Sequence, residues 1–124
     1  MYRIAVLSDH VENGQKLAKQ TKKICNERGI FPKVELHHSQ EEFFDYAQRD
    51  VPTSVILSME GVAGLNAAEH LRSLCPECGL IWCSDLDFSL HAYRLRAEYF
   101  ILMPVTEMEL KNGLSVWMKN KIKI

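Results

Sequence analysis

Short apolar runs alternate with longer amphipathic segments along the whole chain. Continuous or alternating apolar residues at 4–7, 34–36, 55–57, 80–83 and 99–102 predict five strands. Most of these runs are apolar at every position, which is typical of strands covered on both faces of a sheet. The run at 34–36 is shorter and alternates, which favours a position at the edge of the sheet.

The segments between these runs carry apolar residues at helical spacing. Five helices are predicted around residues 17–25, 43–47, 65–71, 90–93 and 110–118. Ser39 with Glu42, and Thr106 with Glu109, have the spacing of capping boxes and mark two helix starts. Gly29 is placed to end the first helix, because glycine readily adopts the left-handed conformation at that position.

Strands that alternate with helices predict an α/β fold with a parallel sheet and helices on both faces. We expect the flavodoxin-like strand order 2-1-3-4-5 with five helices. In such sheets a ligand site lies at the carboxyl ends of the strands, near the switch in strand order. The residues at these ends are Ser8, Asp9, Ser58, Ser84, Met103 and Pro104.

Length, charge and cysteine content exclude several classes of protein for this chain. The chain has 124 residues, the size of one domain, and we expect residues 1–124 to form it. The formal net charge is −1 with both signs interspersed, which argues against a dedicated nucleic-acid surface. No apolar run approaches a membrane span and the N-terminus lacks a signal-peptide pattern. With only four unevenly spaced cysteines, we expect a reduced, cytoplasmic protein.

At the predicted strand ends the chain resembles the receiver domains of two-component response regulators, whose fold is CheY-like. Within that family it is most similar to receivers that precede LytTR-type DNA-binding domains. The matching text, in the same order and at similar spacing along the chain, comprises residues 3–6 with Asp9, residues 57–68, residues 71–72, residues 81–84 and residues 99–105.

The resemblance assigns a role to each residue at the strand ends. Receivers are phosphorylated on an aspartate, but Ser58 stands at that position. They bind Mg²⁺ with an acidic pair, of which Ser8 and Asp9 keep only one carboxylate. They contact the phosphoryl group with a lysine, and Met103 stands there.

Other elements of the family pattern are kept. Ser84 supplies the hydroxyl that ends the fourth strand, and Phe100 takes the place of the switch aromatic residue. A coupled two-position switch and plain packing explain this pair equally well. Pro104 follows Met103, and receivers commonly have a cis peptide before this proline, so we predict a cis bond here.

These replacements predict a degenerate phosphorylation pocket without catalytic residues, and no cofactor. Asp9 is a weak metal candidate, since Mg²⁺ normally relies on more than one carboxylate, and capping the first helix is the simpler role for it. Glu60 is the nearest carboxylate that could substitute for the lost acceptor. A cleft with one carboxylate and no ammonium group should not stabilise an aspartyl phosphate. We therefore expect no enzyme activity.

The pair Cys75 and Cys78 forms a CxxC motif that could indicate zinc or redox chemistry. A structural zinc site needs four ligands, and neither a second CxxC nor a suitably spaced histidine pair follows. A loop that leads into the fourth strand is the simpler interpretation.

The sequence therefore predicts a signalling module that acts through protein contacts. It leaves open whether this module is the N-terminal part of a longer transcription regulator. The expected contact surface is the fourth helix, fifth strand and fifth helix, with Leu90, Tyr93, Phe100 and Trp117. Its partner would be another protein, a second copy or a DNA-binding output domain. The alternative is a small-molecule sensor that uses the emptied pocket. A flavin or nucleotide protein is disfavoured because no glycine-rich phosphate loop follows the first strand.

Overall fold

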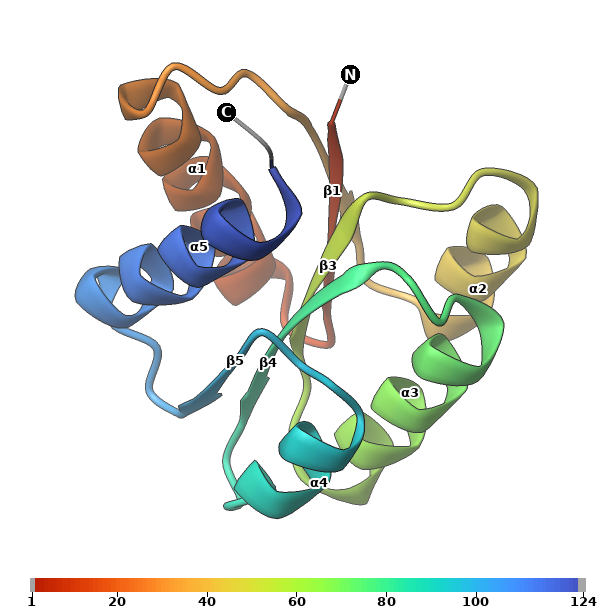
Figure 1. Ribbon diagram of the computed structural model, residues 1–124. Helices are drawn as coiled ribbons and strands as arrows, with labels where there is room; N and C mark the ends of the chain where they lie inside the picture. Colours follow the sequence, from red (N-terminus) through yellow and green to blue (C-terminus); the bar gives the residue numbers. More distant parts are fainter. Residues whose placement is uncertain (1, 123–124) are drawn as a thin grey trace.

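The computed structural model describes residues 2–122, which form one five-stranded parallel sheet with helices on both faces (Figure 1). The strands are β1 (Arg3–Ser8), β2 (Lys33–His37), β3 (Ser54–Ser58), β4 (Gly79–Ser84) and β5 (Tyr99–Leu102). Their order is β2-β1-β3-β4-β5. The predicted fold class and strand order are confirmed.

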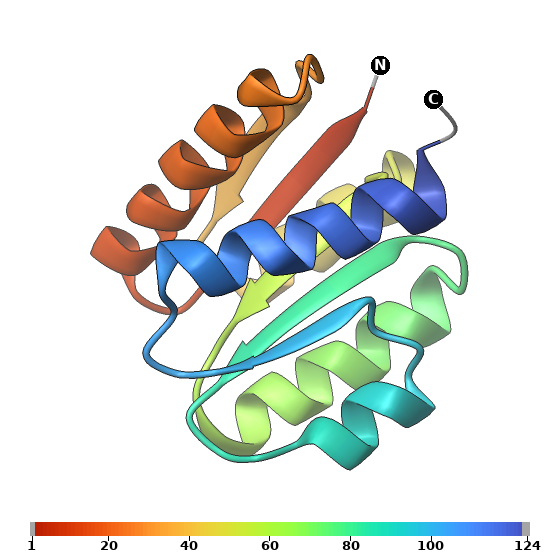
Figure 2. The same cartoon turned by 60° about the vertical axis from the view of Figure 1, so that its left-hand side comes forward.

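Helices cover both faces of the sheet. They are α1 (Val11–Glu27), α2 (Gln40–Arg49), α3 (Gly61–Leu74), α4 (Ser89–Arg94) and α5 (Glu107–Lys121). Helices α1 and α5 lie on one face, and α2, α3 and α4 lie on the other (Figures 1 and 2). Each face has its own buried apolar cluster. No helix within residues 2–122 is long and apolar enough to cross a bilayer.

Local signals at the helix ends behave as expected. The Ser39 hydroxyl accepts a hydrogen bond from the backbone N–H of Glu42, and Thr106 accepts one from that of Glu109. Both bonds satisfy N–H groups that the first helical turn leaves unpaired. Gly29 has a φ of +77° and follows the last turn of α1. The side-chain caps at Ser39 and Thr106 and the glycine stop are therefore confirmed.

The CxxC segment is a loop between α3 and β4, as predicted. Arg72 is buried and donates hydrogen bonds to the carbonyl oxygens of Cys75, Pro76 and Cys78. Both cysteine side chains are buried and free. Burial raises the pKa of the Cys78 thiol to about 12. Arg72 thus fixes the loop through its backbone, and the thiol of Cys78 is held in its unreactive, protonated form.

The close packing of β4 against α5 gives a test of the fold. A Cβ atom at Gly79 would lie 2.7 Å from Cδ1 of Trp117 and 2.9 Å from Oγ of Ser54. Trp117 is fully buried and has no room to move. We expect Gly79→Ala to lower the free energy of unfolding by about 1–3 kcal/mol, measured by urea denaturation.

The control is Gly113→Ala in α5. There the new Cβ atom would lie 3.2 Å from Tyr99, which is only partly buried and can yield, and alanine favours the helix by about 1 kcal/mol. Equal destabilisation by both substitutions would contradict the packing described for Gly79.

The buried cysteines give a second test. Because Cys25, Cys75, Cys78 and Cys83 are all buried, we expect Ellman's reagent to label none of them rapidly in the native protein at neutral pH. All four should react after unfolding in guanidinium chloride. A Cys75–Cys78 pair that reacts at once in the native state would show that the CxxC loop is a redox site.

Candidate functional site

The register of the sheet brings the carboxyl ends of β1, β3 and β4 together; this row of strand ends is called the carboxyl edge below, in contrast to the edge strands β2 and β5. Ser8, the last residue of β1, pairs with Ser58, the last residue of β3, and Ser58 also pairs with Cys83 of β4. Ser8 and Ser58 are both buried. The polar residues that the sequence placed at this edge are therefore neighbours, and Ser58 lies at the centre of the row.

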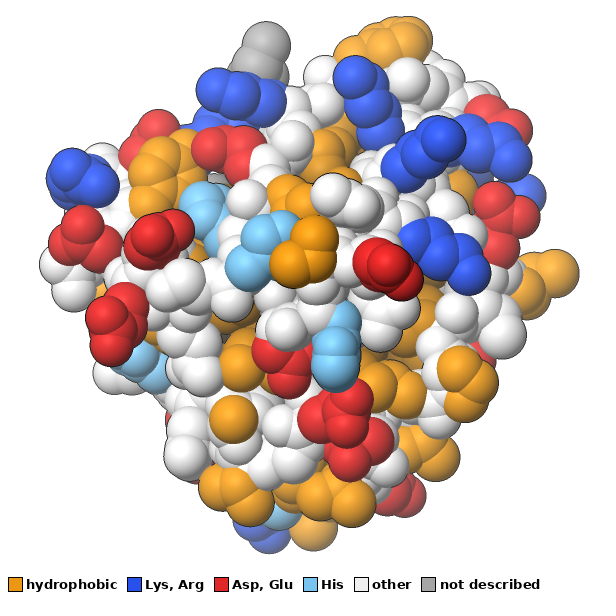
Figure 3. Space-filling view, turned by 180° about the vertical axis from the view of Figure 1, so that it is seen from behind, with side chains coloured by type: hydrophobic (Ala, Val, Ile, Leu, Met, Phe, Trp, Pro, Cys, Tyr) orange, Lys and Arg blue, Asp and Glu red, His pale blue; other side chains and the backbone are white. Residues whose placement is uncertain are grey.

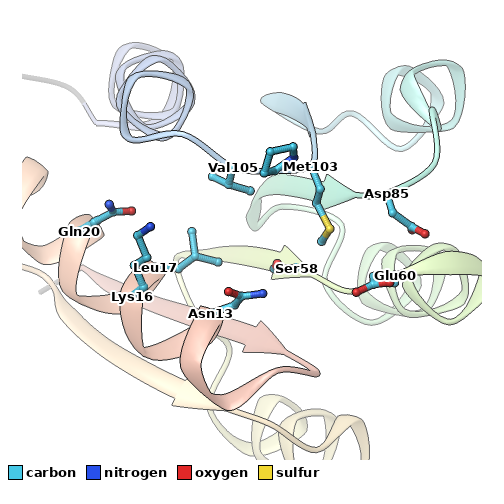
Figure 4. A pocket seen from close by; sticks show the side chains of 10 residues that line it. Asn13, Lys16, Leu17, Gln20, Ser58, Glu60, Asp85, Met103 and Val105 are labelled. Carbon is cyan, nitrogen blue, oxygen red and sulfur yellow. The ribbon is translucent and has the colours of Figure 1, made fainter.

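A cleft of about 440 Å³ opens above this edge, between α1 and the segment that joins β5 to α5 (Figure 4). It is lined by Asn13, Lys16, Leu17, Gln20, Ser58, Glu60, Asp85, Met103, Pro104 and Val105. Four of the predicted site residues, Ser58, Glu60, Met103 and Pro104, line it. Ser8, Asp9 and Ser84 do not belong to the lining.

Met103 gives the cleft an apolar centre. Its side chain points toward Ser58, where the family pattern would place a lysine ammonium (Figure 4). The peptide bond between Met103 and Pro104 is cis, which confirms the prediction. A thioether carries no charge and donates no hydrogen bond, so Met103 cannot neutralise a phosphoryl group.

Two carboxylates hold the loop that follows β3. One carboxylate oxygen of Asp85 accepts a hydrogen bond of 2.7 Å from the backbone N–H of Gly61, the first residue of α3. One oxygen of Asp9 accepts a longer bond of 3.4 Å from the N–H of Glu60. The N–H groups of Glu60 and Gly61, two of those at the start of α3, therefore already have an anionic partner from this chain.

The prediction that Asp9 caps the first helix is wrong. The N-cap of α1 is His10, whose side chain makes no capping hydrogen bond. The side chain of Ser8 instead accepts a bond from the N–H of His10 at 3.2 Å. The chain turns through Ser8 before α1 begins, and this leaves Asp9 free to reach across to the loop after β3.

The expectation of a cleft with one carboxylate and no ammonium group is also wrong. Glu60 and Asp85 both line the cleft, and Lys16 supplies an ammonium group from α1. These charges do not converge, because Lys16 lies at one end of the cleft and the two acids lie at the other (Figure 4). Within residues 2–122, no three Asp, Glu, His or Cys side chains are arranged to hold a metal ion.

The acidic end extends onto the surface through a contact between Glu60 and His10. Nε2 of His10 lies 3.0 Å from a carboxylate oxygen of Glu60, and both side chains are exposed. The view from behind shows acidic side chains next to a histidine in its lower centre (Figure 3). Lys and Arg side chains gather mainly at its upper right, on the side of α1 (Figure 3).

The predicted switch pair has static packing partners. The hydroxyl of Ser84 accepts a hydrogen bond of 3.2 Å from the N–H of Leu86. The ring of Phe100 packs edge-on against Trp82, with 5.5 Å between ring centroids, and Phe88 stacks on Trp82 at 5.4 Å. Both residues therefore have a structural role in holding the loop after β4 and the α4 side of the sheet.

Two of the residues predicted for the contact surface are exposed, and one is buried. Leu90 and Tyr93 of α4 are 59% and 82% exposed. Trp117 is 0% exposed and packs edge-on against Tyr2 beneath α5, so its assignment to the surface is wrong. The apolar periodicity of α5 described the side that faces the sheet. Other large apolar side chains exposed near α4, β5 and α5 are Leu86, Leu102 and Met108.

Some cleft residues were missed. Asp85 directly follows Ser84, so the rule that sites lie at the carboxyl ends of strands would have found it. Asn13, Lys16 and Gln20 lie on one face of α1 at helical spacing. Their polar character resembles that of any solvated helix face, so no sequence signal indicates that they border a cleft.

Comparison with known protein families finds none that matches the chain, and comparison with curated proteins finds no relative. Solved structures are similar over nearly its whole length. A response-regulator receiver domain from Clostridium thermocellum has a TM-score of 0.77 and 17% identity, with 98% of this chain and 97% of that chain covered.

Two further structures show the same likeness. A two-component response regulator from Clostridium difficile has a TM-score of 0.74 and 17% identity, with 99% of this chain and 100% of that one covered. The response regulator DrrB from Thermotoga maritima, an OmpR/PhoB homologue, has a TM-score of 0.69 and 15% identity. This chain covers 55% of DrrB, and 99% of this chain is matched. The chain therefore has the fold of a response-regulator receiver domain.

Proposed function

We propose that the protein is a receiver-like signalling module that is not phosphorylated on aspartate and that acts through protein contacts. The carrying observation is Ser58, which ends β3 at the centre of the carboxyl edge, with the thioether of Met103 directed toward it (Figure 4). The position that would accept a phosphoryl group thus offers a hydroxyl, and its neighbour is apolar.

The chemistry of phosphoryl transfer requires more than this edge supplies. A serine hydroxyl is a weak nucleophile unless a base activates it, and it cannot form an acyl phosphate. Developing negative charge on the phosphoryl oxygens requires a cation close by. Lys16 belongs to the same cleft but lies at the end remote from Glu60 and Asp85 (Figure 4).

Two backbone N–H groups of the loop after β3 already have hydrogen-bond partners. Helix N-termini bind anions through free backbone N–H groups. Here the N–H groups of Glu60 and Gly61 are bonded to the carboxylates of Asp9 and Asp85. An incoming phosphoryl group would have to displace these carboxylates and would meet their negative charge, so the loop is held without phosphorylation.

The contact surface supports the second part of the proposal. Strand β5 forms an edge of the sheet between α4 and α5 (Figure 2). The exposed apolar side chains Leu90, Tyr93 and Leu102 lie on α4 and β5. An exposed strand edge with apolar neighbours is a ready surface for association. The partner is a second copy or another protein, and a LytTR-type DNA-binding output domain is the partner that the sequence resemblance favours.

The first test is chemical. After incubation of the protein with acetyl phosphate and Mg²⁺, we expect intact mass spectrometry to show no added phosphoryl group, because the acceptor aspartate is replaced by Ser58. A phosphorylatable receiver treated in parallel is the positive control. A stoichiometric adduct that hydroxylamine removes would contradict the proposal, since hydroxylamine cleaves acyl phosphates.

The second test locates the contact surface. A photoreactive phenylalanine analogue placed at Tyr93, which is 82% exposed, should form crosslinks to another protein or a second copy in cells. The matched control is the same analogue at Phe31, which is 70% exposed and lies outside α4, β5 and α5.

The substitution Leu90→Glu should reduce the crosslinking from position 93 at least several-fold. It should leave the free energy of unfolding within about 0.5 kcal/mol, because Leu90 is exposed. Equal crosslinking from positions 93 and 31, or none from position 93, would contradict the assignment of this surface.

A further inference from the structure

The cleft above Ser58 has charged groups of opposite sign at its two ends. Lys16 and Gln20 of α1 lie at one end, and Glu60 and Asp85 lie at the other (Figure 4). The side chains of Lys16, Glu60 and Asp85 are all exposed, so solvent or a ligand can reach them. The cleft is therefore a dipolar site as well as an emptied phosphorylation pocket.

These end groups do not neutralise one another. Within residues 2–122, the salt bridges involve neither Lys16 nor Asp85. Asp85 accepts hydrogen bonds from the N–H of Gly61 and the hydroxyl of Ser84, which orient its carboxylate and supply no positive counter-charge. An anionic group of a ligand would be favoured beside Lys16, and a cationic group would be favoured beside Asp85.

Between the two ends, the cleft has an apolar wall opposite the polar side chains of Ser58 and Asn13. Leu17, Met103, Pro104 and Val105 line it from α1 and from the segment that joins β5 to α5. Such a wall suits methylene groups, which gain about 0.8 kcal/mol each when fully buried. A volume of about 440 Å³ lies within the usual range for small-molecule sites and admits a ligand of modest size.

We propose that this cleft binds a small aliphatic zwitterion, with its carboxylate beside Lys16 and its ammonium group beside Asp85 and Glu60. An aliphatic zwitterion would then be the ligand class of a small-molecule sensor that uses this pocket. It depends neither on the contact surface of α4 nor on the outcome of the phosphorylation test. A bound zwitterion would link α1, the loop after β3 and the segment after β5, and would give the module a signal that requires no phosphoryl transfer.

The experiment is a titration of the full chain, labelled with ¹⁵N, against three probes followed by NMR. The probes are 6-aminohexanoate, which carries both charges, and hexanoate and hexylamine, which carry one each. We expect saturable shifts of cleft residues with 6-aminohexanoate, and affinities about 10-fold lower for the two singly charged probes, because each lacks one charged hydrogen bond.

Substitutions at each end of the cleft test which charged group of the ligand binds there. Lys16→Gln should lower the affinity for 6-aminohexanoate to that for hexylamine and leave hexylamine binding unchanged. Asp85→Asn should lower it toward that for hexanoate, with Glu60 as the remaining acid, and asparagine still offers an oxygen to the N–H of Gly61. The matched control is Lys19→Gln, which removes a lysine of the same helix that does not line the cleft and should change nothing.

Several outcomes would overturn the proposal. They are the absence of saturable shifts in the cleft, equal affinities for the three probes, and equal effects of Lys16→Gln and Lys19→Gln. Binding of inorganic phosphate in place of the zwitterion would also overturn it. None of these results bears on whether Ser58 is phosphorylated or on which proteins contact Tyr93, so failure of this proposal is distinguishable from failure of the proposed function.

Discussion

Parallel pairing of β1, β3 and β4 is the constraint on which the site depends. Because the three strands run in the same direction and in register, Ser8 lies beside Ser58, and Ser58 lies beside Cys83. Every loop that leaves the carboxyl edge begins within reach of Ser58. The chemical character of the site is therefore set by the few side chains that end or follow the strands, while the apolar clusters on the two faces only hold the strands in place.

At this edge, polar side chains bond to the loops that follow the strands. The side chains of Asp9 and Asp85 bond to the loop after β3, and the hydroxyl of Ser84 bonds to the loop after β4. Met103 adds an apolar surface above Ser58. These contacts stabilise one arrangement of the loops. The carboxyl ends of the strands are thus tied to the loops beside them by the chain's own hydrogen bonds.

The sequence predicted the fold well because its signals are local. Capping boxes at Ser39 and Thr106 and the apolar strand runs determine where elements begin, and parallel βαβ connections leave few topologies. It predicted the residues of the strand ends for the same reason. It failed where partners come from distant segments: Asp9 bonds to a loop 51 residues away, and Lys16 borders a cleft built from other elements. The prediction that Trp117 lies on the contact surface failed for a different reason. An apolar position in a helix does not reveal whether that side of the helix is buried against the sheet or exposed.

The proposal that the protein is not phosphorylated on aspartate can be tested by an NMR titration of the ¹⁵N-labelled chain with Mg²⁺ and beryllofluoride. Beryllofluoride forms a stable mimic of an aspartyl phosphate. If Ser58, Met103 and the occupied loop N–H groups prevent this chemistry, the resonances of Glu60, Gly61 and Ser84 will stay unchanged up to millimolar concentrations. If these resonances shift saturably, and only when both Mg²⁺ and beryllofluoride are present, the carboxyl edge still binds a phosphoryl group. That result would contradict the proposal that the protein is not phosphorylated on aspartate.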